Sequence, residues 1–70
     1  MSKSTMFQVG NYFVRISDSR QSLKLAVWDD TGDKLLSEFV SNDHSGRFWN
    51  MVGNRTSDTV VEAVKERIYA

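Results

Sequence analysis

Apolar and polar residues alternate with a period of two through two neighbouring segments of the chain, residues 11–17 and 22–29. Such alternation is typical of β-strands that bury one face and expose the other. The polar link at residues 18–21 is short, so the two segments are expected to form an antiparallel hairpin. The apolar positions of this hairpin are Tyr12, Val14, Ile16, Leu23, Leu25 and Val27.

A third strand is predicted at residues 34–41, after a turn at residues 30–33 in which Gly32 supplies a positive φ. Either of two residue pairs could point inward, Leu35 with Phe39 or Leu36 with Val40. A bulge at Gly32 would exchange one pair for the other, because a one-residue slip turns every side chain over. Residues 6–9, before Gly10, predict a further short edge strand.

The apolar spacing then becomes helical. Residues 42–45 are of the N-cap type, and Phe48, Trp49, Met51 and Val52 follow at helical spacing, with Gly53 expected to end this helix. Residues 56–58 predict the start of a second helix, where Asp58 suits the positive end of the helix dipole. The apolar stripe of the second helix is Val60, Val61, Val64 and Ile68.

These elements predict a single α+β domain over residues 1–70, with residues 1–5 as a flexible tail. The expected order is β-β-β-α-α: an antiparallel sheet of three to four strands, packed on one face by two C-terminal helices. A core in so small a chain contributes only about 3–5 kcal/mol, so either a monomer or a homodimer is compatible with it. The expected core is Tyr12, Val14, Ile16, Leu23, Leu25, Val27, Trp49, Val61, Val64 and Ile68.

The composition argues against catalysis and metal binding. The chain has no cysteine, and its one histidine, His44, lies in a segment of helix-capping composition. The four glycines form neither a dinucleotide fingerprint nor a phosphate loop, and a domain of this size has little room for a pocket of about 300 Å³. We therefore expect no enzyme, no cofactor and no metal site.

Charge and hydropathy limit the partners and the location. Nine basic and nine acidic residues balance, whereas a dedicated nucleic-acid-binding protein usually carries a basic excess. No segment resembles a signal peptide or a membrane span. A cytoplasmic location without membrane contact is expected.

The outward face of the hairpin is the best candidate surface. The hairpin predicts Arg15 opposite Lys24 and Phe13 opposite Ala26, with Trp28 further along the same face. Like charges placed across a strand pair cost stability, so this arrangement indicates a surface that holds a negatively charged ligand. The alternative is a solvated face on which the N-terminal segment covers Trp28.

The acidic turn that contains Asp29, Asp30 and Asp33 is the second candidate. Gly32 comes too early for a calcium-binding loop of the helix-loop-helix type. The segment is either a solvated hairpin turn or an acidic contact point for a basic partner.

The chain resembles the small phage-encoded inhibitors of the anti-CRISPR type. The similarity lies in the order and spacing of the elements, from residues 11–17 through residues 38–40 and 47–52 to the final helix. It implies a non-enzymatic protein that binds a host nucleic-acid-binding complex, such as a CRISPR surveillance complex, and blocks it. This protein-binding function is the leading hypothesis.

Residues 6–10 followed by two strands are similar to the positive-cofactor family of single-stranded-DNA-binding proteins. This resemblance implies a curved antiparallel sheet with Phe13, Arg15, Lys24 and Trp28 in its binding groove. The chain differs from that family in its neutral net charge, in its second short helix and in lacking the basic residues expected along the strands. A single-stranded nucleic-acid-binding domain is therefore the alternative hypothesis.

Overall fold

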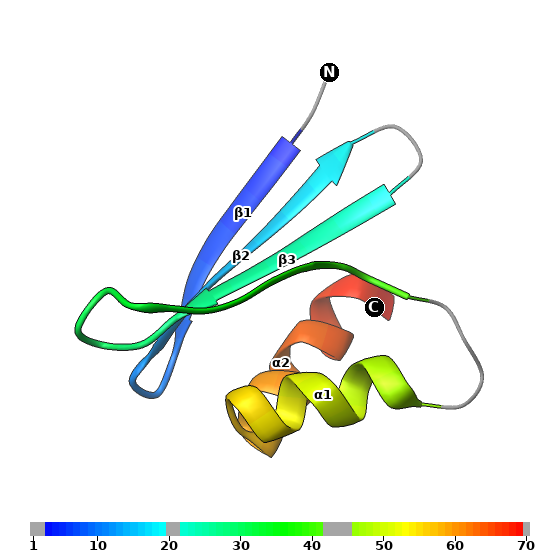
Figure 1. Ribbon diagram of the computed structural model, residues 1–70. Helices are drawn as coiled ribbons and strands as arrows, with labels where there is room; N and C mark the ends of the chain where they lie inside the picture. Colours follow the sequence, from blue (N-terminus) through cyan, green and yellow to red (C-terminus); the bar gives the residue numbers. More distant parts are fainter. Residues whose placement is uncertain (1–2, 20–21, 42–45, 70) are drawn as a thin grey trace.

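The computed structural model describes residues 3–19, 22–41 and 46–69, and its architecture is the predicted α+β class. A four-stranded antiparallel sheet, with its strands side by side in chain order, is followed by two helices that pack on one face (Figure 1). The elements are β1 (Lys3–Val9), β2 (Tyr12–Ser19), β3 (Ser22–Trp28), β4 (Lys34–Phe39), α1 (Arg47–Arg55) and α2 (Asp58–Tyr69).

The leading strand is longer than the predicted residues 6–9. Lys3, Ser4 and Thr5 belong to β1 and pair with Asp18, Ser17 and Ile16 of β2, in that order. The prediction of a flexible tail is therefore wrong for these three residues, because β2 extends far enough to offer them partners. Met1 and Ser2 of that predicted tail lie outside the described residues.

The β2–β3 hairpin has a different register from the predicted one. Pairing continues to Ser19 opposite Ser22, so the link is shorter than the predicted residues 18–21. Arg15 consequently lies opposite Ala26 and not opposite Lys24, and Phe13 lies opposite Trp28. The predicted juxtaposition of like charges is wrong. The shift is two residues, so every side chain keeps its predicted face.

The face of the last strand is decided by a bulge. The pairing of β3 with β4 shifts between Val27, which lies opposite Leu36, and Trp28, which lies opposite Lys34. Leu35 is the extra residue, so the irregularity falls there and not at the turn glycine Gly32. Leu36 is buried, which selects the second of the two predicted inward faces.

Helix α1 continues through Gly53, which was expected to end it. The helix begins after Gly46 and ends at Arg55, and the predicted N-cap residues 42–45 lie outside the described residues. A Cβ atom at position 53 would lie 3.3 Å from Oδ1 of Asp58 and 3.6 Å from Cγ2 of Val61. Glycine is thus used here for the close approach of α2 and not as a terminator.

Helix α2 begins where the sequence predicts. The backbone N–H of Val60 donates to Oγ of Ser57 at 3.3 Å, which is the N-cap hydrogen bond. The hydroxyl of Tyr12 donates to the carbonyl oxygen of Thr56 at 3.2 Å and ties β2 to the segment between the helices. The sheet and the helix pair are therefore joined by a specific polar contact as well as by packing.

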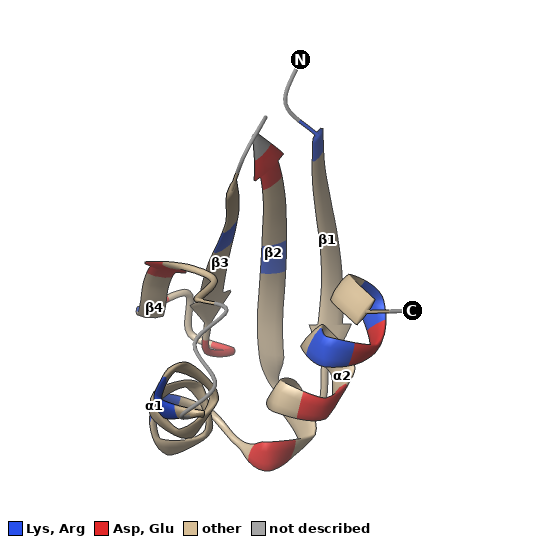
Figure 2. Cartoon of the chain, turned by 90° about the vertical axis from the view of Figure 1, so that its right-hand side faces the viewer, with Lys and Arg blue, Asp and Glu red and all other residues tan. Residues whose placement is uncertain are grey.

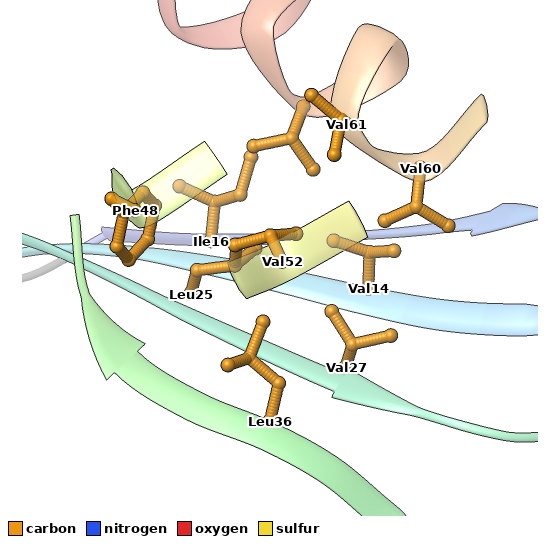
Figure 3. Packing of buried hydrophobic residues seen from close by; sticks show 10 residues of the cluster. Val14, Ile16, Leu25, Val27, Leu36, Phe48, Val52, Val60 and Val61 are labelled. Atoms are coloured by element: carbon orange, nitrogen blue, oxygen red, sulfur yellow. The ribbon is translucent and has the colours of Figure 1, made fainter. Parts of the chain in front are cut away.

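The core lies between the sheet and the helices (Figure 3). Six of the ten predicted core residues are buried, and Tyr12, Leu23, Trp49 and Ile68 pack against the cluster while partly exposed. Of the adjacent aromatic residues Phe48 and Trp49, it is Phe48 that is buried. The fully assembled cluster is Val14, Ile16, Leu25, Val27, Leu36, Phe48, Val52, Val60, Val61 and Val64.

Candidate functional site

The face of the sheet opposite the helices, here called the outer face, is an ordered grid of side chains. Strand pairing aligns outward-pointing residues of all strands into rows that run across the sheet. The first row is Gln8, Phe13, Trp28 and Lys34; the second is Met6, Arg15, Ala26 and Ser37; the third is Ser4, Ser17, Lys24 and Phe39.

The outer face carries one sign of charge. Its ionisable residues are Arg15, Lys24 and Lys34, and none of the outward-facing strand positions just named is Asp or Glu. Basic residues accordingly mark the middle of β2 and β3 in Figure 2. The formal net charge of zero therefore hides a positive strand surface, and the acidic residues Asp29, Asp30 and Asp33 lie in the turn at one end of it.

Large apolar side chains are exposed on the same face. Met6 is 64% exposed, Phe39 is 61% exposed and Phe13 is 39% exposed, while Trp28 is half-buried. Within the described residues, Tyr69 on α2 is the other large apolar side chain of this degree of exposure. Exposed apolar patches on a small domain mark interaction sites more often than chance.

Each basic residue of the outer face lies close to an aromatic ring. The guanidinium of Arg15 lies 5.2 Å from the centre of the Trp28 ring, and Nζ of Lys34 lies 5.6 Å from it. Nζ of Lys24 lies 5.7 Å from the centre of the Phe39 ring. These distances are in the range of cation–π attraction, which holds the positive charges over the ring faces.

Arg15 occupies the centre of the grid. Its Nε is buried and has no hydrogen-bond partner within the described residues. Packing against Trp28, rather than a hydrogen bond to Nε, holds this side chain. A buried donor without a partner is costly, so the packing that holds Arg15 in this position must offset that cost.

The acidic turn lies at one end of this face, after Trp28. Oδ1 of Asp29 accepts hydrogen bonds from the hydroxyl of Thr31 at 2.7 Å, from the N–H of Thr31 at 3.0 Å and from the N–H of Asp33 at 2.9 Å. The Thr31 hydroxyl, followed by these backbone donors, lowers the pKa of Asp29 below its ordinary value. The carboxylate of Asp29 therefore stabilises the turn, whereas Asp30 and Asp33 are exposed beside it.

The structure brings together Phe13, Arg15, Lys24 and Trp28, as the sequence predicted, although in a different register. The N-terminal segment does not cover Trp28, because β1 pairs with β2 and not with β3. Sequence reasoning missed Lys34, Phe39 and Met6. For Lys34 and Phe39 the only available signal was the alternation in residues 34–41, which the bulge at Leu35 interrupts.

A hollow of about 370 Å³ lies on the helix side of the sheet, which corrects the expectation that the domain has little room for one. Its lining comes from β1, β2, β3 and the C-terminal part of α2, and Figures 1 and 2 show that the ends of these strands extend past the helices. The lining combines apolar side chains with charged side chains of both signs. The lining residues are Lys3, Thr5, Ile16, Asp18, Leu23, Arg67 and Ile68.

Other kinds of site find little support in the described part of the chain. No group of three or more His, Cys, Asp or Glu side chains in residues 3–19, 22–41 and 46–69 could hold a metal ion, and His44 lies outside these ranges. Neither described helix has the length and hydropathy needed to cross a membrane. Comparisons with protein-family models, with curated proteins and with solved structures found no match.

Proposed function

We propose that this chain is a non-enzymatic domain that binds single-stranded nucleic acid on its outer face. The observation that supports the proposal is the grid itself: aromatic rings at Phe13, Trp28 and Phe39, interleaved with three basic residues and with no acidic residue among the outward-facing strand positions. This combination matches the chemistry of a single strand, whose bases stack on rings and whose phosphates attract cations.

A single strand fits this face better than a duplex does. A ring that stacks on a base needs the flat side of that base, which is hidden inside a double helix. Within the described residues, neither helix lies on the outer face, where one could enter a major groove. The arrangement of rings on an open sheet therefore favours unpaired bases.

The proposal is tested by fluorescence anisotropy with a labelled oligothymidylate, titrated with the protein at several salt concentrations. If Arg15, Lys24 and Lys34 each neutralise one phosphate, the logarithm of the association constant should fall with the logarithm of salt concentration with a slope of about −2. A duplex of the same length should bind more weakly. Absence of binding at low salt would overturn the proposal.

Substitutions then locate the site. Trp28→Ala should weaken binding roughly 5- to 150-fold, which corresponds to about 1–3 kcal/mol for one stacked base. Lys24→Ala should weaken binding and make the salt slope shallower. Lys65→Ala is the matched control for Lys24, because Lys65 makes a comparable contact, 5.4 Å from the centre of the Trp49 ring, away from the outer face. Equal effects of the two lysine substitutions would contradict this location.

A protein-binding inhibitor of the anti-CRISPR type is the second candidate. The high exposure of Met6 and Phe39 favours it, because exposed apolar side chains can anchor a protein interface. In this case the partner is a host nucleic-acid-binding complex, and Asp30 and Asp33 would meet basic groups on it. Mixing the tagged chain with a purified CRISPR surveillance complex, with and without nuclease, discriminates the candidates. Nuclease-resistant capture that Phe39→Ala and Asp30→Lys abolish would favour the inhibitor.

A further inference from the structure

We infer that the ligand of the outer face is an extended single strand of at least three nucleotides, held at two separated stacking positions. The inference rests on the proposed single-strand binding and specifies the ligand for the same site. The first stacking position is formed by Phe13 and Trp28, and the second by Phe39. Each has its own cations: Arg15 and Lys34 lie over the Trp28 ring, and Lys24 lies over the Phe39 ring.

The strand register sets the distance between the two positions. Phe39 lies opposite Lys24, and Lys24 is four residues from Trp28 on β3. With a rise of about 3.3 Å per residue, the two positions are about 13 Å apart along the strands. Neighbouring bases stacked as in a duplex strand are only about 3.4 Å apart, so two such bases cannot occupy both positions.

The row between the two positions has no ring on which a base could stack. Its members on β2, β3 and β4 are Arg15, Ala26 and Ser37. Ala26 is buried at 3% exposure and Ser37 is half-buried, so neither offers a surface on which a base could stack, while Arg15 supplies a positive charge between the two positions. The middle row therefore suits a backbone crossing between two stacked bases rather than a third stacked base.

The length of a nucleotide then gives the minimum ligand. Even when stretched to about twice the duplex rise, one nucleotide step covers only about 7 Å. Two such steps are needed to cross from Trp28 to Phe39, and two steps join three nucleotides. A dinucleotide can stack at one position only, whereas a trinucleotide can reach both.

The test is to measure the affinity of oligothymidylates of two, three, four and six nucleotides for the parent chain and for Phe39→Ala. We expect the affinity to rise roughly 5- to 150-fold between two nucleotides and the first length that reaches Phe39, since a second base then stacks. Phe39→Ala should remove this rise and leave dinucleotide binding nearly unchanged. Trp28→Ala should weaken every length. Tyr69→Ala, which truncates a similarly exposed ring on α2, is the matched control.

The outcomes separate the two claims. If no oligonucleotide binds at any length, the proposed function fails and the inference fails with it. If the oligonucleotides bind but the affinity rises evenly with length, or if Phe39→Ala weakens the dinucleotide as much as the hexanucleotide, the two-position arrangement is overturned while single-strand binding stands. Circular dichroism melting of each variant confirms that the compared proteins are folded.

Discussion

The two faces of the sheet are built from alternate residues of the same strands, yet they differ in burial and in charge. The inner face contributes Val14, Leu25 and Val27, all fully buried against the helices. The outer face contributes neighbours of these residues, Arg15, Lys24 and Trp28, which alternate with the inward-facing positions along β2 and β3.

From this difference we expect that substitutions on the outer face can change the proposed binding without changing stability. Burial of a large apolar side chain contributes about 1.5–3 kcal/mol, so the inner face carries most of the energy that holds the domain together. Surface substitutions usually change stability by no more than about 0.5 kcal/mol. The outer face can therefore hold exposed rings and positive charges without unfolding the protein.

The largest expected effect is on the free energy of unfolding, and it distinguishes Leu25 from its neighbour Lys24. Leu25→Ala should lower the free energy of unfolding by about 2–5 kcal/mol, because it leaves a cavity in the core. Lys24→Ala should change the free energy of unfolding by less than about 0.5 kcal/mol. Urea denaturation followed by circular dichroism measures both. Similar losses for the two variants would show that the faces are not distinct.

Two single-residue deletions test which residue of β4 decides the side of the sheet that Phe39 faces. Deleting Leu35 removes the bulge but leaves Leu36 inward and Phe39 outward, so the grid and nucleic-acid binding should survive. Deleting Ser37 shortens the chain equally but turns Phe39 inward and Val40 outward. The Ser37 deletion should be less stable than the Leu35 deletion by about 1.5–3 kcal/mol. Of the two variants, only the Ser37 deletion should lose the contribution of Phe39 to nucleic-acid binding. If urea denaturation showed the Leu35 deletion to be the less stable of the two, the bulge would have to lie at another residue.

The smallest effect concerns the acidic turn beside the outer face. Because hydrogen bonds lower the folded-state pKa of Asp29 below its ordinary value of 3.8, the carboxylate stabilises the turn at pH values above 3.8. This stabilisation is lost as the pH falls through the lowered pKa. Titration by NMR should show Asp29 ionising below 3.8, and Thr31→Ala should raise that pKa. An unchanged pKa in Thr31→Ala would contradict the assigned cause.

The sequence predicted the candidate site only in part. Phe13, Arg15, Lys24 and Trp28 could be placed on one face because alternation alone assigns faces. The predicted register placed Arg15 opposite Lys24, whereas Arg15 lies opposite Ala26. Its face was still predicted correctly, because a two-residue shift does not turn side chains over. Phe39 could not be placed, because a single extra residue at Leu35 decides whether it points inward or outward.

The class of the fold, the faces of β2 and β3 and the apolar stripe of α2 could be predicted from periodicity, because periodicity records which side of an element meets the core. Features that depend on a partner element appear only in the folded chain. Lys3, Ser4 and Thr5 are strand because β2 reaches them, and the role of Gly53 is visible only from the close approach of α2. Local sequence carries no record of such neighbours, so pairing register, bulge position and the assembled outer face emerge only when the strands and helices meet.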